Sequence, residues 1–344
     1  MAQRLKKRKY IGMDFHTRTT TLAIFDPYAE NPYERMAVKT IRGSLKTVLD
    51  SLKTIKGPYE ICYEASTGYG VVHDTLTRCA DRVVVAHPGK LKRSKEKNDK
   101  NDAQTLAKLL FADIVPTVHV PRTDIRGWRQ LINHRNRLVT ERTAVKNALR
   151  ALLRGLAIDT PRNLWTKTSL AWLQALEFDS SSDALMRDTH LGHLAYIHDA
   201  IRRVEVELDA IAAKHPGVAL LQTIPGVGPR TAEAIVAWVD DPRRFRSSKS
   251  IGNYLGLVPC QDASADRNRL GRITKAGPPV IRRLLNQAAW QAIRLSPEVR
   301  AFRDRIQRDD PKRKNPALVA TMHYLARVMV AMLLHGTAWA PRTA

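Results

Sequence analysis

The stretch from residue 9 to residue 25, KYIGMDFHTRTTTLAIF, decides the fold of the first part of the chain. Apolar and β-branched residues fill positions 10–15 and 19–25, and the polar residues 16–18 separate them, which predicts a β-hairpin. Asp14 conflicts with this pattern, because it places a carboxylate inside an apolar strand. A buried charge is costly unless it is paired or binds a metal. Asp14 is therefore the first candidate functional residue.

Strand and helix patterns alternate after this hairpin. A helical pattern covers residues 45–55, an apolar strand pattern covers 59–63, and a helix over 71–79 precedes a strand over 82–86. This order predicts an α/β layer built on a mixed sheet. Glu64 directly follows the strand pattern over 59–63, so a second carboxylate stands where a strand ends.

A lysine-rich loop over residues 88–100 leads to two further carboxylates. Asp99 and Asp102 begin a helical pattern three residues apart, which puts both side chains on one helical face. Taken alone, Asp102 could cap the helix and Asp99 could pair with a nearby lysine. The loop is either a solvated charge run or a contact for a nucleic-acid backbone, and we favour the contact. Its basic residues are Lys92, Arg93, Lys95 and Lys97.

The charge balance of the whole chain points to a polyanionic partner. The 344 residues include 57 Lys and Arg against 33 Asp and Glu, which gives a formal net charge of +24. The surplus runs through the whole chain and favours nucleic acid, which is bound through counterion release. An anionic membrane surface is the alternative, but no lipidation motif or long amphipathic basic helix supports it.

Carboxylates gathered in such a basic protein predict divalent metals held beside phosphates. The four acidic residues could hold two Mg²⁺ ions about 3.5–4 Å apart, the arrangement used for in-line phosphoryl displacement. These proposed ligands are Asp14, Glu64, Asp99 and Asp102. ATPases of the sugar-kinase and actin type share the hairpin-first layout. However, residues 15–17 lack a glycine that would let the backbone approach a phosphate, and no GxxxxGK[ST] loop occurs.

Long helices are predicted in the middle of the chain. Apolar residues recur every seven positions at Leu131, Leu138, Val145 and Leu152, and a second apolar stripe covers residues 194–212. This predicts a helical hairpin or coiled coil, used as a subunit contact, as a spacer or for intramolecular packing. We therefore predict three parts: residues 1–123, the helical region 124–215, and a mainly helical part over 216–344.

A turn with two glycines opens the third part. The segment IPGVGPRTA at 224–232 places Gly226 and Gly228 directly before a helix, with Arg230 beside them. This pattern is typical of a helix-hairpin-helix that binds a DNA backbone without sequence preference. A structural turn between helices is the alternative.

A serine surrounded by arginines follows in a predicted loop. Ser264 lies close in sequence to Arg267, Arg269 and Arg272. Such a serine could attack a phosphodiester while the guanidinium groups neutralise the developing charge. By composition alone, however, a loop serine is most often part of the polar surface.

The cysteines and the apolar segments predict a cytoplasmic protein. Cys62, Cys79 and Cys260 show neither zinc-ligand spacing nor the even number that disulfides need. The basic N-terminus leads into a strand rather than an apolar signal core. The apolar stretch 317–334 contains His323 and Arg327, so we expect that it does not span a bilayer.

These motifs together resemble the DEDD-type insertion-sequence transposases, which are related to the Piv DNA invertases. Some members are described as bridge-RNA-guided recombinases. The resemblance covers nearly the whole chain. It is carried by GMD at 12–14, YEA at 63–65, DKNDA at 99–103, IPGVG at 224–228, GLVP at 256–259, ITKAG at 273–277 and RAFRDR at 300–305.

The resemblance implies a RuvC-like, RNase H-type first domain in which the four carboxylates bind Mg²⁺. It also implies that Ser264 attacks DNA and forms a phosphoserine link beside the acidic site of a partner subunit. A structured guide RNA from the non-coding end of the element, a dimer or tetramer, and a prokaryotic, nucleoid-associated setting follow in the same way. The chain departs from the family at two positions, where Ala265 replaces a common glycine and Cys260 replaces a common basic residue.

The resulting prediction is a transposase that cuts and rejoins DNA without a membrane partner. Three more basic residues near these motifs are assigned to nucleic-acid contacts: Lys275, Arg282 and Arg283. A structure-selective nuclease such as a junction resolvase, which uses the acidic site alone, is one alternative. A non-catalytic nucleic-acid scaffold is another.

Overall fold

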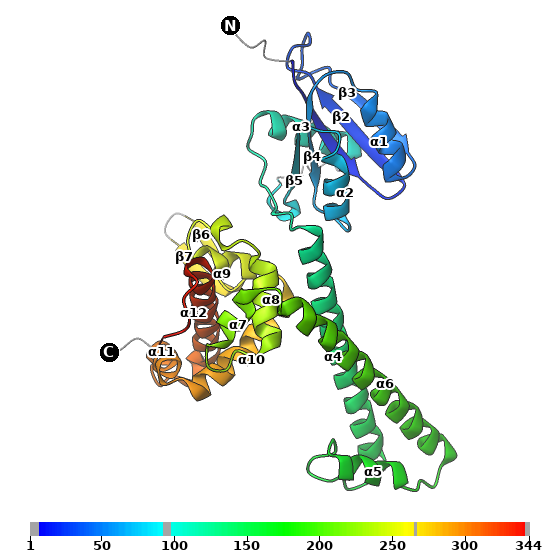
Figure 1. Ribbon diagram of the computed structural model, residues 1–344, viewed down its shortest axis with the longest axis vertical. Helices are drawn as coiled ribbons and strands as arrows, with labels where there is room; N and C mark the ends of the chain where they lie inside the picture. The colour runs from blue at the N-terminus through cyan, green and yellow to red at the C-terminus, as the bar shows by residue number, and fades with distance from the viewer. Residues whose placement is uncertain (1–6, 92–97, 265–266, 341–344) are drawn as a thin grey trace. The chain divides into compact units, whose positions relative to one another are not determined.

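The chain forms two compact units, residues Met1–Thr123 and Asp124–Ala344 (Figure 1). The computed structural model describes residues 7–91, 98–264 and 267–340, with the backbone alone at 262–264 and 267–269. Each unit has its own hydrophobic core.

A five-stranded mixed sheet forms the centre of the first unit, in the order β3-β2-β1-β4-β5. β1 (Lys9–Phe15) and β2 (Thr19–Phe25) pair antiparallel as the predicted hairpin. β1 also pairs in parallel with β4 (Tyr59–Glu64), which pairs in parallel with β5 (Arg82–Ala86). The structure thereby confirms the predicted α/β layer on a mixed sheet.

One strand of the sheet was missing from the sequence prediction. β3 (Ala37–Arg42) pairs with β2 at the edge of the sheet, and Ile41 is its one buried side chain. An edge strand with mostly exposed side chains lacks a regular apolar alternation. Sequence periodicity therefore does not distinguish this segment from a loop.

Helices cover both faces of the sheet. α1 (Leu45–Lys53) and α2 (Tyr69–Leu76) share a core with the side chains on one face of β1. α3 (Asp99–Phe111) crosses the other face over β1 and β2. Gly12 makes this crossing possible, because a Cβ atom there would lie 1.8 Å from the Ala103 carbonyl oxygen. The backbones of β1 and α3 are therefore in direct contact.

Three helices begin the second unit. α4 (Thr123–Gly155), α5 (Lys167–Ala175) and α6 (Ser181–Ala212) enclose a shared apolar cluster. The predicted seven-residue repeat on α4 supplies Leu138 and Val145 to this cluster, so it serves packing within the chain. α6 begins well before the predicted residue 194, because the Ser180 side chain accepts a hydrogen bond from the Ser182 N–H and caps the helix.

The rest of the second unit is mainly helical, as predicted. Its helices are α7 (Pro216–Gln222), α8 (Pro229–Val239), α9 (Ser250–Leu255), α10 (Pro279–Leu295), α11 (Pro297–Gln307) and α12 (Lys314–His335). Short 3₁₀ turns occur at Pro88–Lys90 in the first unit and at Pro242–Arg244 and Pro311–Arg313 in the second. A two-stranded hairpin, β6 (Pro259–Ser264) with β7 (Arg267–Ile273), was expected to be a loop. Its arginine-rich strands lack the apolar pattern of a core strand.

The last long helix is apolar enough to resemble a membrane span. The segment Pro311–His335 meets the length and hydropathy of such a span, despite the polar residues that argued against one in the sequence. Half of its most apolar window is buried inside the protein, and α12 packs on α10 and α11. Its apolar surface is therefore accounted for by core packing.

Candidate active site

Two carboxylates reach the same edge of the sheet. Asp14 and Glu64 lie near the ends of the neighbouring parallel strands β1 and β4, one residue beyond the last paired positions. Strand alternation puts Asp14 on the face of Gly12 and Glu64 on the face of Cys62. Gly12 contacts α3, and Cys62 packs in the cluster that α3 covers. Both carboxylates therefore lie on the face of the sheet that α3 crosses.

The first turn of α3 brings the other two carboxylates. Asp99 and Asp102 occupy this turn, and negative charge is favourable there because it opposes the helix dipole. Asn98 caps the helix through its side-chain oxygen, which accepts the Lys100 N–H at 3.0 Å. This removes the alternative in which Asp102 is the cap. The lysines considered as partners of Asp99 lie outside the described residues.

A single cavity of about 280 Å³ is lined by all four predicted acids. The sequence placed them over a span of almost ninety residues, and the crossing of α3 over β1 brings them together. Phe15, His16 and Thr17 line the cavity from the turn after β1, and Ser66 and Thr67 line it after β4. The predicted convergence of the acids is thus present in the fold.

His16 is a residue of this cavity that the sequence interpretation treated only as part of a turn. Its Nε2 atom lies 3.4 Å from Asp14 Oδ1. Ligand atoms of Asp14, His16 and Asp99 all lie within 4.8 Å of one another, as a shared metal ion would require. The sequence could have indicated this role of His16, because a histidine in a turn two residues after a strand carboxylate can lie beside that carboxylate.

The electrostatics of the cavity favour a bound cation. Burial raises the pKa of Asp14, and the neighbouring carboxylates of Asp99, Asp102 and Glu64 raise it further, whereas His16 lowers it. Carboxylates this close repel one another when all are ionised. A divalent cation between them would compensate both the burial and the repulsion.

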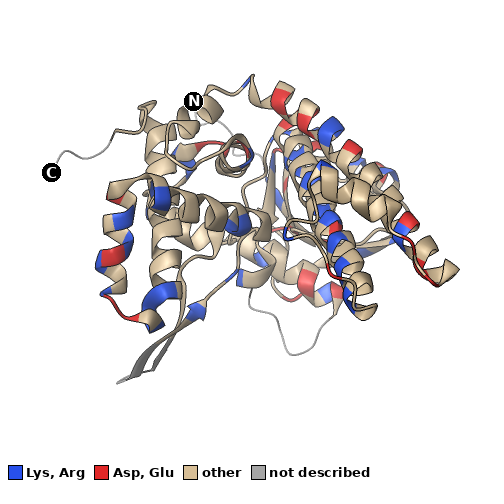
Figure 2. Cartoon of the chain, turned by 90° about the horizontal axis from the view of Figure 1, so that it is seen from below, with Lys and Arg blue, Asp and Glu red and all other residues tan. Residues whose placement is uncertain are grey.

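The basic residues of the second unit that the sequence assigned to nucleic-acid contacts differ in exposure and in bonding partners. Lys and Arg are spread over many helices rather than gathered in one segment (Figure 2). Arg272 and Lys275 are exposed. The Arg282 guanidinium donates to the backbone oxygens of Leu255 and Gly277, so this arginine holds the structure together. Both bonds use the Nη1 atom, and the assignment of Arg282 to a nucleic-acid contact stays a prediction.

The turn with two glycines does connect two helices, α7 and α8. Gly226 has a φ of +87°, and a Cβ atom there would lie 2.5 Å from the Ala292 amide nitrogen of α10. Close packing on α10 therefore requires this glycine, and its assignment to a phosphate contact stays a prediction. Gly228 precedes α8 and has open space around its Cα. It is compatible with the predicted backbone contact.

Arg230 is also committed to the interior. Its guanidinium pairs with Asp209, and its Nη1 atom lies 3.4 Å from Glu233 Oε1. The Arg230 side chain is only 16% exposed and that of Glu233 is 1% exposed. Arg230 thus offsets the charge of a buried carboxylate, and its assignment to a nucleic-acid contact stays a prediction.

We expect Glu233→Gln to raise the melting temperature at about pH 8 and to change it much less at about pH 5. Burial raises the pKa of Glu233 from 4.5 to about 7, although Arg230 lowers it. The folded state therefore binds the proton more tightly, and stability falls as pH rises from about 4.5 through 7. Above that range the ionised group costs on the order of 3 kcal/mol, which the amide avoids.

Thermal melts at the two pH values measure this effect. Glu207→Gln, on the exposed face of α6, removes the same charge and is the matched control. A Glu233→Gln protein that melts below the parent at the higher pH would show that the ion pair with Arg230 outweighs the cost of burial.

The serine motif lies in the β6–β7 hairpin. Ser264 is the last residue of β6 and pairs with Arg267, the first residue of β7, so it is not in a loop as expected. Arg269 also belongs to β7. The side chains of Ser264, Arg267 and Arg269 lie outside the described residues, as do the predicted contacts of the first unit: Lys92, Arg93, Lys95 and Lys97.

Comparison with known proteins defines the class. The DEDD transposase model of IS110 elements matches residues 11–158, which include all four acids. The Transposase IS116/IS110/IS902 family model matches residues 218–304, which include the serine motif. The chain therefore belongs to the IS110/IS116-type family of DEDD transposases.

Individual relatives agree with this assignment. The chain is similar to the putative transposase y4qE of Sinorhizobium fredii, at 29% identity over 70% of this chain and 61% of the relative. It is also similar to the transposase for insertion sequence element IS1111A of Coxiella burnetii, at 27% identity over 84% of this chain and 79% of the relative. The transposase for IS1328 of Yersinia enterocolitica is 32% identical over 56% of this chain and 59% of the relative.

Proposed function

We propose that the chain is a transposase that cuts and rejoins DNA strands to excise and insert a mobile element. The observation that carries this proposal is the single cavity lined by Asp14, Glu64, Asp99 and Asp102 in a chain of this family. The net charge of +24 suits a protein that must hold DNA phosphates close to those carboxylates.

The acidic cavity is the proposed site of divalent metal, and we propose Mg²⁺. Carboxylate oxygens are the ligands that Mg²⁺ prefers, and the close approach of Asp14, His16 and Asp99 ligand atoms fits one shared ion. A bound ion supplies charge neutralisation for a reacting phosphodiester. The chain itself holds the carboxylates in place through the contact of α3 with β1.

The proposed fold of the first unit is RuvC-like, of the RNase H type. The strand order β3-β2-β1-β4-β5 combines an antiparallel three-stranded part with two parallel strands. Carboxylates at the ends of β1 and β4 and on a helix crossing them support this proposal.

Ser264 is the proposed nucleophile. In the proposed step the serine oxygen attacks a phosphorus atom, a phosphoserine bond forms, and the bond to the leaving strand oxygen breaks. The hydroxyl proton passes to a base, and the leaving oxygen takes up a proton. The energy of the phosphodiester is conserved, so the strand can be rejoined without free ends.

The resemblance extends this proposal to two partners. A structured RNA encoded by the element would choose the donor and target DNA by base pairing, and a second copy of the chain would place its acidic site beside Ser264. A dimer or tetramer in the cytoplasm would carry out the reaction. The basic excess of the chain supports nucleic acid of either kind.

We expect Ser264→Ala to reduce strand joining by about a thousandfold or more, because the attacking oxygen is lost. The measurement combines a joining assay on element and target DNA with detection of a protein–DNA phosphoserine adduct. Ser247→Ala, on an exposed part of the same unit, is the matched control.

Ser264→Ala also distinguishes the proposed transposase from the alternative, a nuclease that hydrolyses DNA with the acidic cavity alone. The acidic cavity is formed within the first unit by itself, as a hydrolytic nuclease would need. Cleavage that persists at the parent rate in Ser264→Ala, with no adduct in either protein, would identify a junction-resolving nuclease instead. Joining at the parent rate would contradict the role of Ser264.

A further inference from the structure

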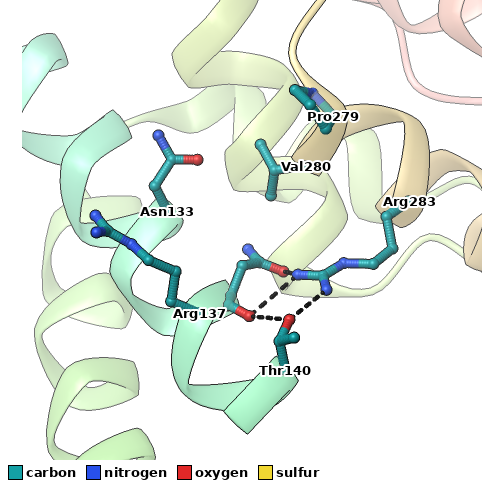
Figure 3. Close-up of a pocket in the computed structure, with 7 residues that line it drawn as sticks. Asn133, Arg137, Thr140, Pro279, Val280 and Arg283 are labelled. Atoms are coloured by element: carbon teal, nitrogen blue, oxygen red, sulfur yellow. Dashed lines mark hydrogen bonds between the residues drawn. The ribbon is translucent and has the colours of Figure 1, made fainter. Parts of the chain in front are cut away.

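A polar groove separates α4 from α10 in the second unit. Two adjoining cavities, of about 410 and 580 Å³, form the groove and share Asn136, Thr140 and Arg283. Figure 3 shows the residues that line the smaller one. Their lining consists of arginines, amides, threonines and a few apolar residues, and no described carboxylate lines either one. The groove is thus positively charged and rich in hydrogen-bond donors.

Arg283 is held rigidly in the wall of this groove. Its Nη1 atom donates to Thr140 Oγ1 at 2.9 Å, and its Nη2 atom donates to the backbone and side-chain oxygens of Asn136. Asn136 is itself buried and donates to the Ile132 carbonyl oxygen. Three of the five guanidinium N–H groups are used in these bonds, and the side chain remains exposed. A fixed arginine of this kind binds an anion with little loss of conformational entropy.

The start of α10 opens into the same groove. Pro279 and Val280, in its first turn, line the smaller cavity. The N-cap residue Pro278 makes no side-chain cap, and the first turn contains no acidic residue. Pro279 has no N–H, so the first-turn amides without a partner in the helix begin at Val280, and the dipole makes this end positive. The helix end and Arg283 therefore present positive charge to the same space.

Two further arginines lie on the α4 side. Arg137 is exposed and stands across the smaller cavity from Arg283, as Figure 3 shows, and Arg142 lines the larger cavity. In the described part of the chain, neither pairs with a carboxylate. Exposed arginines elsewhere do, for example Arg202 with Asp199 and Arg243 with Asp241. Arg135, which also lines the larger cavity, pairs with Glu205, so the available charge on the α4 side is that of Arg137 and Arg142.

We propose that this groove binds the sugar-phosphate backbone of DNA. One phosphate would lie at the start of α10, between Arg137 and Arg283, and the strand would continue along α4 past Arg142. Arginine, amide and hydroxyl donors together with a helix N-terminus are the groups that contact DNA phosphates. The choice of DNA rests on the proposed transposase function, whereas the anionic chemistry rests on the groove alone.

Binding of the full-length chain to a fluorescent DNA duplex of about 30 base pairs, at salt from about 50 to about 200 mM, tests the proposal. A chelator keeps divalent metal out. We expect Arg137→Gln/Arg142→Gln to weaken binding about tenfold and to reduce the salt slope by about 1.8, which corresponds to two phosphate contacts. Arg202→Gln/Arg243→Gln removes the same charge from paired surface arginines and should change the affinity far less.

A second variant adds charge instead of removing it. Thr143 lies in the groove, and its hydroxyl donates to the carbonyl oxygen four residues earlier, as the hydroxyl of Thr189 does on α6. Thr143→Glu should weaken DNA binding, and Thr189→Glu should leave it close to that of the parent. Unchanged melting temperatures establish that all four proteins are folded.

The outcomes separate the groove from the acidic site. If the groove variants and their controls lose the same amount of affinity for the DNA duplex, the proposal is overturned. If the groove variants bind an RNA duplex more weakly than the parent but bind the DNA duplex as the parent does, the choice of DNA is overturned. All binding is measured with a chelator present, so a failure of the proposed metal chemistry would leave this result intact.

Discussion

Asp14→Asn is expected to reduce the rate of metal-dependent DNA cleavage by about a thousandfold or more, while the protein stays folded and binds DNA. Asp14 is the half-buried strand carboxylate on which the other ligands converge. An amide there can offer a metal only a neutral oxygen. Cleavage of element DNA across a series of Mg²⁺ concentrations measures the loss, and duplex binding without metal measures what is retained.

The same substitution should stabilise the metal-free protein. Burial and the neighbouring carboxylates raise the pKa of Asp14, so the ionised group is unfavourable in the folded state at neutral pH. The contribution of this group to stability is present at low pH and is lost as pH rises through its folded-state pKa. Asp14→Asn should therefore melt above the parent without metal at about pH 8. Added Mg²⁺ should raise the melting temperature of the parent and leave that of the variant unchanged.

Asp50→Asn is the matched control for both measurements, because Asp50 is an exposed carboxylate on α1 that pairs with Lys53. It should cleave DNA and respond to Mg²⁺ as the parent does. A variant at Asp14 that cleaves DNA at the parent rate, or that Mg²⁺ stabilises as much as the parent, would contradict the role of Asp14 as a metal ligand.

Gly12→Ala is expected to destabilise the first unit by roughly 3 kcal/mol or more and to eliminate cleavage as well. The added Cβ atom would lie 1.8 Å from the Ala103 carbonyl oxygen and 2.6 Å from the Ala107 amide nitrogen. Both are backbone atoms of α3, so the whole helix must move away from β1. Asp99 and Asp102 would move with it and leave Asp14.

Urea unfolding and Mg²⁺-induced stabilisation together measure the two effects of this substitution. Gly192→Ala is the control, because a Cβ atom at that position of α6 meets no neighbouring atom, and alanine favours a helix by about 1 kcal/mol. A Gly12→Ala protein as stable as the parent would contradict the direct backbone contact between β1 and α3.

Local patterns were sufficient to predict several elements. The β1–β2 hairpin follows from two apolar, β-branched runs around a polar turn, and α3 follows a lysine-rich loop with Asp99 and Asp102 in its first turn. β3 and the β6–β7 hairpin were missed, because their exposed or arginine-rich residues carry no apolar alternation. Such strands form because a neighbouring strand supplies hydrogen bonds, which periodicity does not record.

The basic residues show the same difference between local and tertiary information. Arg230 and Arg282 have the sequence surroundings of DNA contacts, yet their guanidinium groups bind a buried carboxylate and backbone oxygens. Arg137 and Arg142 belong to a helix that is rich in charged residues throughout, so no local pattern distinguishes them, yet they line the groove. Burial and partners decide what an arginine does, and both depend on residues far away in the chain.

The sequence by itself determined which residue types were available: carboxylates at strand ends and in a helix start, inside a chain with a large positive charge. Only the tertiary structure decided that Asp14, His16, Glu64, Asp99 and Asp102 share one cavity, and that α10 begins beside Arg137 of α4. The physical reason is that a side chain's alternation along a strand or helix is a local property. Which elements cross, and how closely, is set by packing, here by the space that Gly12 leaves for α3.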